Sequence, residues 1–270
     1  MLWGRPHMPM TYPILDPRAS AATQAGVVPG ACALAMMIKA PRPGASKTRL
    51  SPPLTPEEAA ALSGCFLRDT TANIAAARTA AAPAAGVAVY TPTGMESAFD
   101  GLLPAGFCMV AQRDGTFGER LIGAVEDLFA VGYGAVCLID SDSPTLPAAS
   151  LAAAVHALSQ PGDRAVLGPS EDGGYYLIGV KKAHRRLFED ITWSTEHVSR
   201  ETLERAAEID LEMLQLPAWY DVDDAATLRA LCEELFAGAR PGQGFDAPQT
   251  RAFLAGLIER EGRGRIWADG

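Results

Sequence analysis

The sequence predicts an α/β fold: a single Rossmann-like three-layer α/β/α domain with a mostly parallel central sheet. Two observations carry this prediction. Short apolar runs alternate along the chain with helical segments of about 10–20 residues, the pattern of a parallel sheet covered by helices on both faces. The chain is also long enough to bury one large core, because it has 270 residues of which 48% are hydrophobic.

Strands are expected where apolar runs are bounded by glycine, proline or polar turn residues. In chain order they are Ala31–Ile38, Val87–Tyr90, Phe107–Ala111, Ala135–Ile139, Arg164–Leu167, Tyr175–Val180 and Leu211–Leu216. Two helices have clear starts, because Thr55 precedes Pro56 and two glutamates, and Thr116 with Glu119 forms a capping-box sequence. The expected helices are Thr55–Ala80, Thr116–Val131, Pro147–Ser159, Glu196–Glu208, Asp224–Phe236 and Pro248–Arg260.

The chain divides into three parts. Residues 1–30 are rich in Pro, Ala and polar residues and lack the apolar core of a secretory signal, so we expect a flexible N-terminal arm. Residues 31–237 form the expected main domain. Residues 238–270 are expected to be a linker and a C-terminal helix that packs on the domain and could serve a homodimer. No apolar run reaches the ~20 residues that span a bilayer, so no membrane span is expected.

Composition narrows the class of partner. The formal net charge is −9, from 23 basic and 32 acidic residues, and there is no basic tract. Duplex nucleic acid and anionic membranes are therefore not expected as partners. The five cysteines lie far apart without a CxxC pair, which argues against a zinc site or a disulfide framework and indicates a reducing, cytoplasmic location.

The most informative segment is Asp140-Ser141-Asp142, which directly follows an apolar strand and precedes Pro144. In open α/β sheets, ligands bind at the carboxyl ends of strands. Two Asp at alternate positions of extended backbone point the same way, which suits a hard divalent cation that also carries phosphates. The alternative is that Asp142 only caps the helix that starts near Pro147.

The loop after the first strand, Lys39–Leu50, is basic in an otherwise acidic protein. Its prolines stiffen it and Gly44 permits a turn, so the backbone N–H groups of residues 44–48 could form an anion site. It is not a Walker A loop, because Ser46 stands where that motif has glycine, and no GxGxxG follows a strand. The alternative is a solvated basic loop. The expected nucleotide contacts here are Lys39, Pro41, Gly44, Lys47, Thr48 and Arg49.

Two further polar segments follow strands. Asp172-Gly173-Gly174 precedes the strand at Tyr175, and its glycines permit a ligand to approach the backbone closely, although an ordinary turn would use the same residues. The second segment is Trp219–Asp224, which follows an apolar strand, and its Asp224 is the natural cap of the next helix. Alternation then places Asp221 and Asp223 on one face.

Taken together, these segments resemble the nucleotide-diphospho-sugar transferase (glycosyltransferase-A) fold over residues 31–236. More closely, the chain resembles the radical-SAM/selenodomain-associated transferase family, and its first loop is similar to 2-phospho-lactate and molybdenum-cofactor guanylyltransferases. The resemblance implies that Asp142 and Asp223 hold a divalent metal. This chain departs from the family pattern at two places. It has Asp224-Ala225 in place of Thr-Pro, and it has Asp140 in place of glycine, which makes Asp140 a further candidate metal ligand. Gln112 matches another family segment and is expected to contact the nucleotide.

We therefore expect a transferase that handles a nucleotide with Mg²⁺ or Mn²⁺ and a small-molecule acceptor. The catalytic candidates are Lys47 and Asp142, which would act on phosphates and metal, and Asp172, which would orient or deprotonate the acceptor. Gly173, Gly174 and Trp193 are expected to bind the acceptor, although Trp193 could equally be a packing aromatic.

Three functions fit these residues. Nucleotidyl transfer from a nucleoside triphosphate is the first expectation, because pyrophosphate is a highly charged leaving group and the first loop is cationic. Glycosyl transfer from a nucleotide-diphospho-sugar is the second. A non-catalytic nucleotide-binding protein on the same fold is the third.

Overall fold

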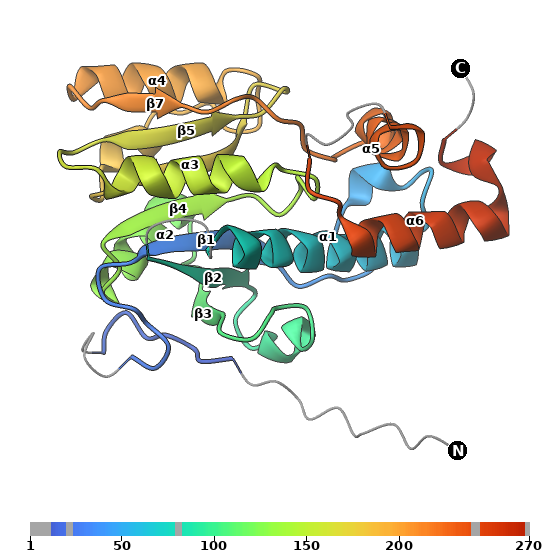
Figure 1. Ribbon diagram of the computed structural model, residues 1–270, viewed down its shortest axis with the longest axis horizontal. Helices are drawn as coiled ribbons and strands as arrows, with labels where there is room; N and C mark the ends of the chain where they lie inside the picture. The colour runs from blue at the N-terminus through green and yellow to red at the C-terminus, as the bar shows by residue number, and fades with distance from the viewer. Residues whose placement is uncertain (1–11, 20–23, 79–82, 239–243, 268–270) are drawn as a thin grey trace.

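A computed structural model describes residues 12–19, 24–78, 83–238 and 244–267. Within these residues one seven-stranded sheet has the order β3-β2-β1-β4-β6-β5-β7 (Figure 1). Its strands are β1 (Cys32–Lys39), β2 (Ala84–Thr91), β3 (Cys108–Ala111), β4 (Ala135–Ile139), β5 (Ala165–Pro169), β6 (Tyr175–Val180) and β7 (Met213–Gln215). The predicted α/β class and mostly parallel sheet are confirmed.

The helices lie close to their predicted positions. They are α1 (Pro56–Ala77), α2 (Phe117–Ala130), α3 (Ala148–Ser159), α4 (Val198–Glu208), α5 (Ala225–Ala237) and α6 (Pro248–Glu261). Short 3₁₀ turns are η2 (Thr48–Leu50), η3 (Glu96–Phe99), η4 (Arg185–Phe188) and η5 (Arg263–Arg265). Thr55 and Thr116 each form the capping box that the sequence predicts.

Two hydrophobic clusters, one on each face of the sheet, make the three layers. Along β1, Leu34 and Met36 belong to the cluster covered by α1, α3, α5 and α6, whereas Ala33 and Ala35 face the cluster covered by α2 and α4. This alternation follows from the twofold repeat of a strand. Because the strand is buried on both faces, its sequence is apolar throughout.

The strand directions decide where polar segments can meet. β1, β2, β3 and β4 are mutually parallel, and β5 is parallel to β7, but β6 is antiparallel to both β4 and β5. The start of β6 therefore lies at the same sheet edge as the ends of β1, β4 and β5. The basic loop, the Asp140–Asp142 segment and the Asp172–Gly174 turn consequently share one edge.

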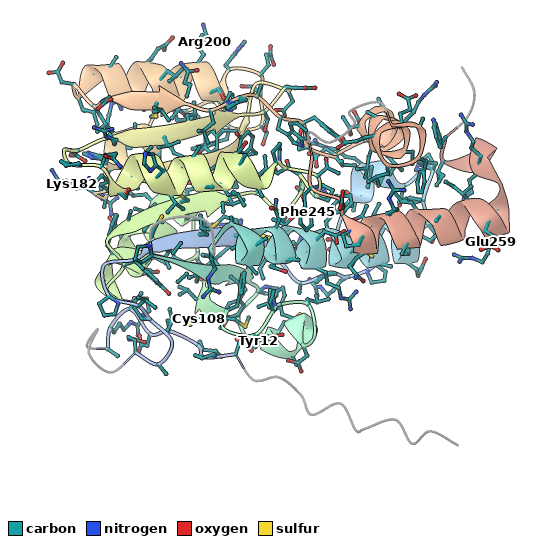
Figure 2. The ribbon with its side chains drawn as sticks, in the orientation of Figure 1. Tyr12, Cys108, Lys182, Arg200, Phe245 and Glu259 are labelled. Atoms are coloured by element: carbon teal, nitrogen blue, oxygen red, sulfur yellow. The ribbon has the colours of Figure 1, made fainter. Side chains whose placement is uncertain are left out.

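The N-terminal segment adds to the opposite flank. In the part that the structure describes, Met109 of β3 donates its N–H to Pro13 at 2.8 Å, and Leu15 donates back to Met109 at 2.8 Å. The hydroxyl of Tyr12, which lies beneath β3 in Figure 2, donates to the carbonyl of Leu103 at 2.7 Å. Residues 12–15 of the expected flexible arm thus pack alongside β3, the outermost strand on this side of the sheet. Residues 1–11 lie outside the described residues.

Helix α6 packs against α1. The buried carboxylate of Asp69 on α1 accepts hydrogen bonds from the N–H groups of Gln249 (3.0 Å) and Thr250 (2.7 Å), so α1 caps the start of α6. Arg265 forms an ion pair with Glu58 at the far end. The linker expected at Gly238–Asp246 lies partly outside the described residues. None of the described helices combines the length and the apolar character that a bilayer crossing requires.

Candidate active site

Three side chains from distant parts of the chain meet at the carboxyl ends of the parallel strands. The ammonium of Lys47 lies 2.9 Å from an Asp142 carboxylate oxygen and 2.8 Å from one of Asp223. Arg49 lies at the rim, with its guanidinium 3.5 Å from the other Asp223 oxygen. The structure thus brings together the basic loop and two of the three acidic segments that the sequence singles out.

Backbone conformation directs Lys47 inward. Its φ is 50°, in the left-handed region, and it precedes the turn of η2, so the side chain points away from solvent with only 7% of its surface exposed. The ammonium also donates to the Val222 carbonyl at 2.7 Å. Burial alone would lower the pKa of Lys47, but the carboxylates of Asp142 and Asp223 raise it above its ordinary value, so Lys47 is charged at neutral pH.

The two carboxylates are held by backbone contacts between their segments. The N–H of Val222 donates to the Asp142 carbonyl at 2.9 Å, which ties the segment before α5 to the end of β4. Asp224 caps α5 through the N–H of Thr227 at 2.9 Å, as the sequence predicts. Because Asp224 serves as the cap, the side chain of Asp223 turns to Lys47 instead.

Two more aspartates crowd the same place. Ser143 donates its hydroxyl to one oxygen of Asp140 at 2.7 Å, while the other oxygen is buried and has no hydrogen-bond partner among the described residues. Burial and the nearby charge of Asp142 hold the pKa of Asp140 well above its ordinary value. Burial, followed by Asp172 and Asp223, raises the pKa of Asp221 to about 6.

Two adjoining cavities share Arg49, Asp142 and Asp223 in their walls. The first, which we call the basic compartment, has a volume of about 240 Å³. It is lined by Lys39, Ala45, Ser46, Lys47, Thr48, Arg49, Ser63, Ser141, Asp142 and Asp223. The second, which we call the acidic compartment, has a volume of about 440 Å³. It is lined by Arg49, Phe117, Asp140, Asp142, Ser170, Asp172, Gly174, Tyr175, Trp193, Ser194, Thr195, Glu196, Val198, Asp221 and Asp223.

The expected nucleotide-binding residues separate into two groups. Lys39, Lys47, Thr48 and Arg49 line the basic compartment, whereas Pro41, Gly44 and Gln112 line neither compartment. The Gln112 side chain instead donates to the carbonyls of Ile38 at 3.2 Å and Val89 at 2.8 Å, and accepts from Arg120 at 3.0 Å. In this structure Gln112 therefore joins the ends of β1 and β2.

The Asp172–Gly174 turn packs on the loop that carries Trp193. Gly173 has a φ of +92°, and a Cβ added to it would lie 2.3 Å from the Glu196 carbonyl oxygen, so no side chain fits there. Ser199 donates its N–H to the Gly173 carbonyl at 2.9 Å. The Asp172 carboxylate accepts from the N–H of Gly174 at 2.8 Å, which fixes its direction at the wall of the acidic compartment.

Trp193 lies in an aromatic cluster at the outer wall of the acidic compartment. Its ring centroid is 5.0 Å from that of Phe117 and 6.4 Å from that of Tyr175, in edge-to-face arrangements. Sequence reasoning did not assign Phe117 or Glu196 to the site, because Phe117 lies within a capping-box sequence and Glu196 was expected only as the first residue of a helix. Only the tertiary packing of α2 and the 193–198 loop against the sheet edge reveals their position.

The comparisons with known proteins concern the family and the fold of this chain. The family described as "uncharacterized protein conserved in bacteria (DUF2064)" matches residues 74–195. The crystal structure of a proposed nucleotide-diphospho-sugar transferase from Desulfovibrio desulfuricans G20 is 30% identical in sequence, with a TM-score of 0.72. The match covers 85% of this chain and 95% of that one. This chain belongs to the nucleotide-diphospho-sugar transferase family.

More distant structures are similar only in outline. A CMP:2-keto-3-deoxy-manno-octonic acid synthetase in complex with CTP is 12% identical, with a TM-score of 0.49, over 75% of this chain and 97% of that one. A cytidylyltransferase from Leptospira borgpetersenii is 10% identical, with a TM-score of 0.47, over 89% and 98%. At these values neither supports an argument about this chain. No curated protein matches the sequence. The family membership makes the protein a nucleotide-handling transferase.

The carboxylates of this nucleotide-diphospho-sugar transferase fit one particular kind of metal site. The described residues contain no group of three or more His, Cys, Asp or Glu side chains that could hold a metal ion by themselves. Mg²⁺, however, is commonly held by only one or two carboxylates together with substrate phosphates. Asp142 and Asp223 provide two such carboxylates, with 36% and 41% of their side-chain surfaces exposed. The donor set therefore fits a cation that arrives with, or is completed by, a nucleotide.

Proposed function

We propose that this transferase moves a glycosyl group from a nucleotide-diphospho-sugar to a hydroxyl acceptor. The observation that carries the proposal is the pairing of the basic compartment with the larger acidic compartment across Lys47, Asp142 and Asp223. Phosphates would lie against Lys39 and Arg49 in the first, and the sugar and acceptor would occupy the second.

Charge favours a diphosphate over a triphosphate. The four cations of the first loop favour a triphosphate donor when the sequence is considered alone. In the folded protein, however, Lys47 is neutralised by Asp142 and Asp223, and Arg42 lines neither compartment. The three cations of the basic compartment face two carboxylates in the same cavity. A nucleoside triphosphate carries more charge than this balance readily accommodates, whereas a diphosphate ester carries less.

The residues present divide the reaction between them. The acceptor hydroxyl oxygen forms a bond to the anomeric carbon, and the bond from that carbon to the β-phosphate oxygen breaks. The nucleoside diphosphate leaves with the electron pair, and the acceptor proton passes to the Asp172 carboxylate. Lys39 and Arg49 stabilise the negative charge that develops on the departing diphosphate. When bound, a Mg²⁺ or Mn²⁺ held by Asp142 and Asp223 would supply further charge neutralisation there.

Nucleotidyl transfer is the second candidate, because Lys39, Lys47 and Arg49 face one cavity. In that reaction an acceptor oxygen forms a bond to the α-phosphorus, the bond to the bridging oxygen breaks, and pyrophosphate leaves. The site is the same, but the leaving group differs.

The leaving group decides between the two. Purified protein with Mn²⁺ is first screened by thermal shift against nucleoside triphosphates and nucleotide-diphospho-sugars, because a ligand that binds the native state raises the melting temperature. The compounds that bind are then incubated with acceptor mixtures. Release of nucleoside diphosphate supports glycosyl transfer, and release of pyrophosphate supports nucleotidyl transfer instead. Nucleotide binding without either product would contradict both and indicate a non-catalytic protein. Asp142→Asn is the matched control and should abolish product release.

A further inference from the structure

The acidic compartment has a charge that restricts what can enter it. Of the charged side chains in its wall, Arg49 is the one cation among those the structure describes, and six are acids. Asp142 and Asp223 are paired with Lys47, and Asp140 accepts a hydrogen bond from Ser143. This leaves Asp172, Glu196 and Asp221 facing the cavity on the side away from the basic loop. The Glu196 side chain is 74% exposed, and its carboxylate lies 3.6 Å from the ring nitrogen of His197.

The same compartment has an apolar wall. Phe117 is 47% exposed, which is unusual for so large an apolar side chain, and it stands edge-to-face with Trp193. Trp193 lies directly on the start of α2, since a Cβ added to Gly118 would come within 2.9 Å of its indole nitrogen. The two rings therefore form a fixed surface whose position is set by the helix.

Buried polar groups in this wall also lack partners. The Tyr175 hydroxyl and one carboxyl oxygen of Asp140 are buried without a hydrogen-bond partner in the described part of the chain, and both residues line the compartment. Buried polar groups in proteins are almost always hydrogen-bonded. Both atoms are closed off from solvent, so they mark a polar interior behind the wall and are not assigned to the ligand.

From these features we infer that the acceptor carries no phosphate or carboxylate group. It is a neutral or amine-bearing hydroxyl compound that lays an apolar face on Trp193 and Phe117 and presents a hydroxyl to Asp172. A phosphorylated acceptor would meet Asp172, Glu196 and Asp221 in a wall where Arg49, on the side of the basic loop, is the one Lys or Arg among the described lining residues, and like charges at such a site reject a ligand. This inference rests on the proposed function, because it assigns the acidic compartment to the group that receives the transferred unit.

The test uses acceptors matched in skeleton and different in charge. Methyl glucoside, glucosamine and glucose 6-phosphate form one set, and glycerol, ethanolamine and glycerol 3-phosphate form another. Each is added to the full-length protein with Mn²⁺ and the donor found by thermal shift, and product release is measured. The neutral or cationic member of a set should exceed its phosphorylated member in kcat/KM at least about tenfold, and the ratio should shrink at high salt.

Three variants locate the effect. Trp193→Ala should raise the acceptor KM at least about fivefold while leaving the donor dissociation constant unchanged. Phe117→Ala should do the same to a smaller degree; its ring is half exposed, so the fold does not depend on it. Glu196→Gln should move the phosphorylated-to-neutral ratio of kcat/KM toward equality about three- to tenfold. Glu189→Gln, a 54% exposed acid outside both compartments, is the control and should not change that ratio.

The outcomes separate the two proposals. Preference for a phosphorylated member, or an unchanged ratio in Glu196→Gln together with an unchanged KM in Phe117→Ala, overturns the inference while the transferase function stands. Absence of donor binding or of any product overturns the proposed function, and the inference falls with it.

Discussion

Lys47 is the residue on which the geometry of the site turns. Its ammonium joins two carboxylates from segments that lie 95 and 176 positions away, and it is buried while they are half exposed. A buried cation is stable only when paired, so Lys47 and the two aspartates hold one another in place. The same ammonium would stand next to the phosphates of a donor.

The first prediction concerns the charge of this residue. Lys47→Ala should weaken donor binding at least about tenfold, because Asp142 and Asp223 would then face the donor phosphates without the cation that neutralises them. The loss should shrink as salt rises, since salt screens the attraction. Isothermal titration at low and high ionic strength measures this. Lys182→Ala is the matched control, because Lys182 follows the antiparallel β6 and lies at the opposite sheet edge (Figure 2). Equal losses at both ionic strengths would show that the charge of Lys47 does not act on donor binding.

The second prediction separates Asp140 from Asp142. Burial holds the pKa of Asp140 well above its ordinary value, and its side chain accepts a hydrogen bond from Ser143, which an asparagine can also accept. Asp140→Asn should therefore keep activity within about threefold, whereas Asp142→Asn should lose about a hundredfold or more, as is usual when electrostatic stabilisation is removed. Steady-state kinetics at several Mn²⁺ concentrations test this. A collapse of metal dependence in Asp140→Asn would make Asp140 a ligand.

At the scale of elements, the contact between the Asp172–Gly174 turn and the 193–199 loop joins two walls of the acidic compartment. Gly173→Ala would place a methyl group against the Glu196 carbonyl and also strain a backbone at φ +92°. It should lower stability by about 1–3 kcal/mol and lower kcat/KM as well. Gly94→Ala is the control, because Gly94 has a φ of +87° but open space around its Cβ position. If both variants lost activity equally, the loop contact would not shape the site.

A second element-scale prediction concerns the cap that α1 gives to α6. Asp69→Ala should destabilise the protein by about 1–2 kcal/mol, because the N–H groups of Gln249 and Thr250 lose their acceptor. Burial raises the pKa of Asp69 above its ordinary value of 3.8, despite the hydrogen bonds from Thr250 that lower it. The folded state therefore holds the proton more tightly than the unfolded state.

The sign of the pH effect follows from this difference. As pH rises from 3.8 to the folded pKa, the contribution of Asp69 to stability should fall, and above the folded pKa it should be level. Asp69→Asn cannot titrate, so the difference in melting temperature between it and the parent protein should change only within that window. Melting curves from pH 3 to 8 give the comparison. A difference that is constant across pH would show that the pKa of Asp69 is not raised.

At the scale of the whole molecule, the sequence predicts which segments meet at the carboxyl ends of the strands. It does not predict which residues line the walls of the cavity there. The apolar run of β4, which ends before Asp140, indicates that the acids lie at the end of a strand. The prolines and cations of Lys39–Leu50 indicate a rigid basic loop at the end of the first strand. Strand ends meet at one edge by topology, so local patterns predict that much. The expected transferase class and fold are those that the D. desulfuricans structure supports.

The rest depended on tertiary packing. The sequence shows four cations close together in the first loop. It does not show that Asp142 and Asp223 form ion pairs with Lys47 and so offset about half of the positive charge of that loop. Phe117 is the first residue of α2 and Glu196 lies just before α4, and no local pattern shows that both line the same cavity as Asp172. Gln112 was expected at the nucleotide, and the structure shows its side chain joining the ends of β1 and β2.

The most direct test of the central claim is the position of a manganese ion. Crystals grown with Mn²⁺ and a non-hydrolysable nucleotide-diphospho-sugar would show the metal by its anomalous scattering. We expect one peak within coordinating distance of Asp142 and Asp223, with the diphosphate against Lys39 and Arg49 and the sugar pointing into the acidic compartment. A metal and diphosphate bound at any other edge of the sheet would contradict it.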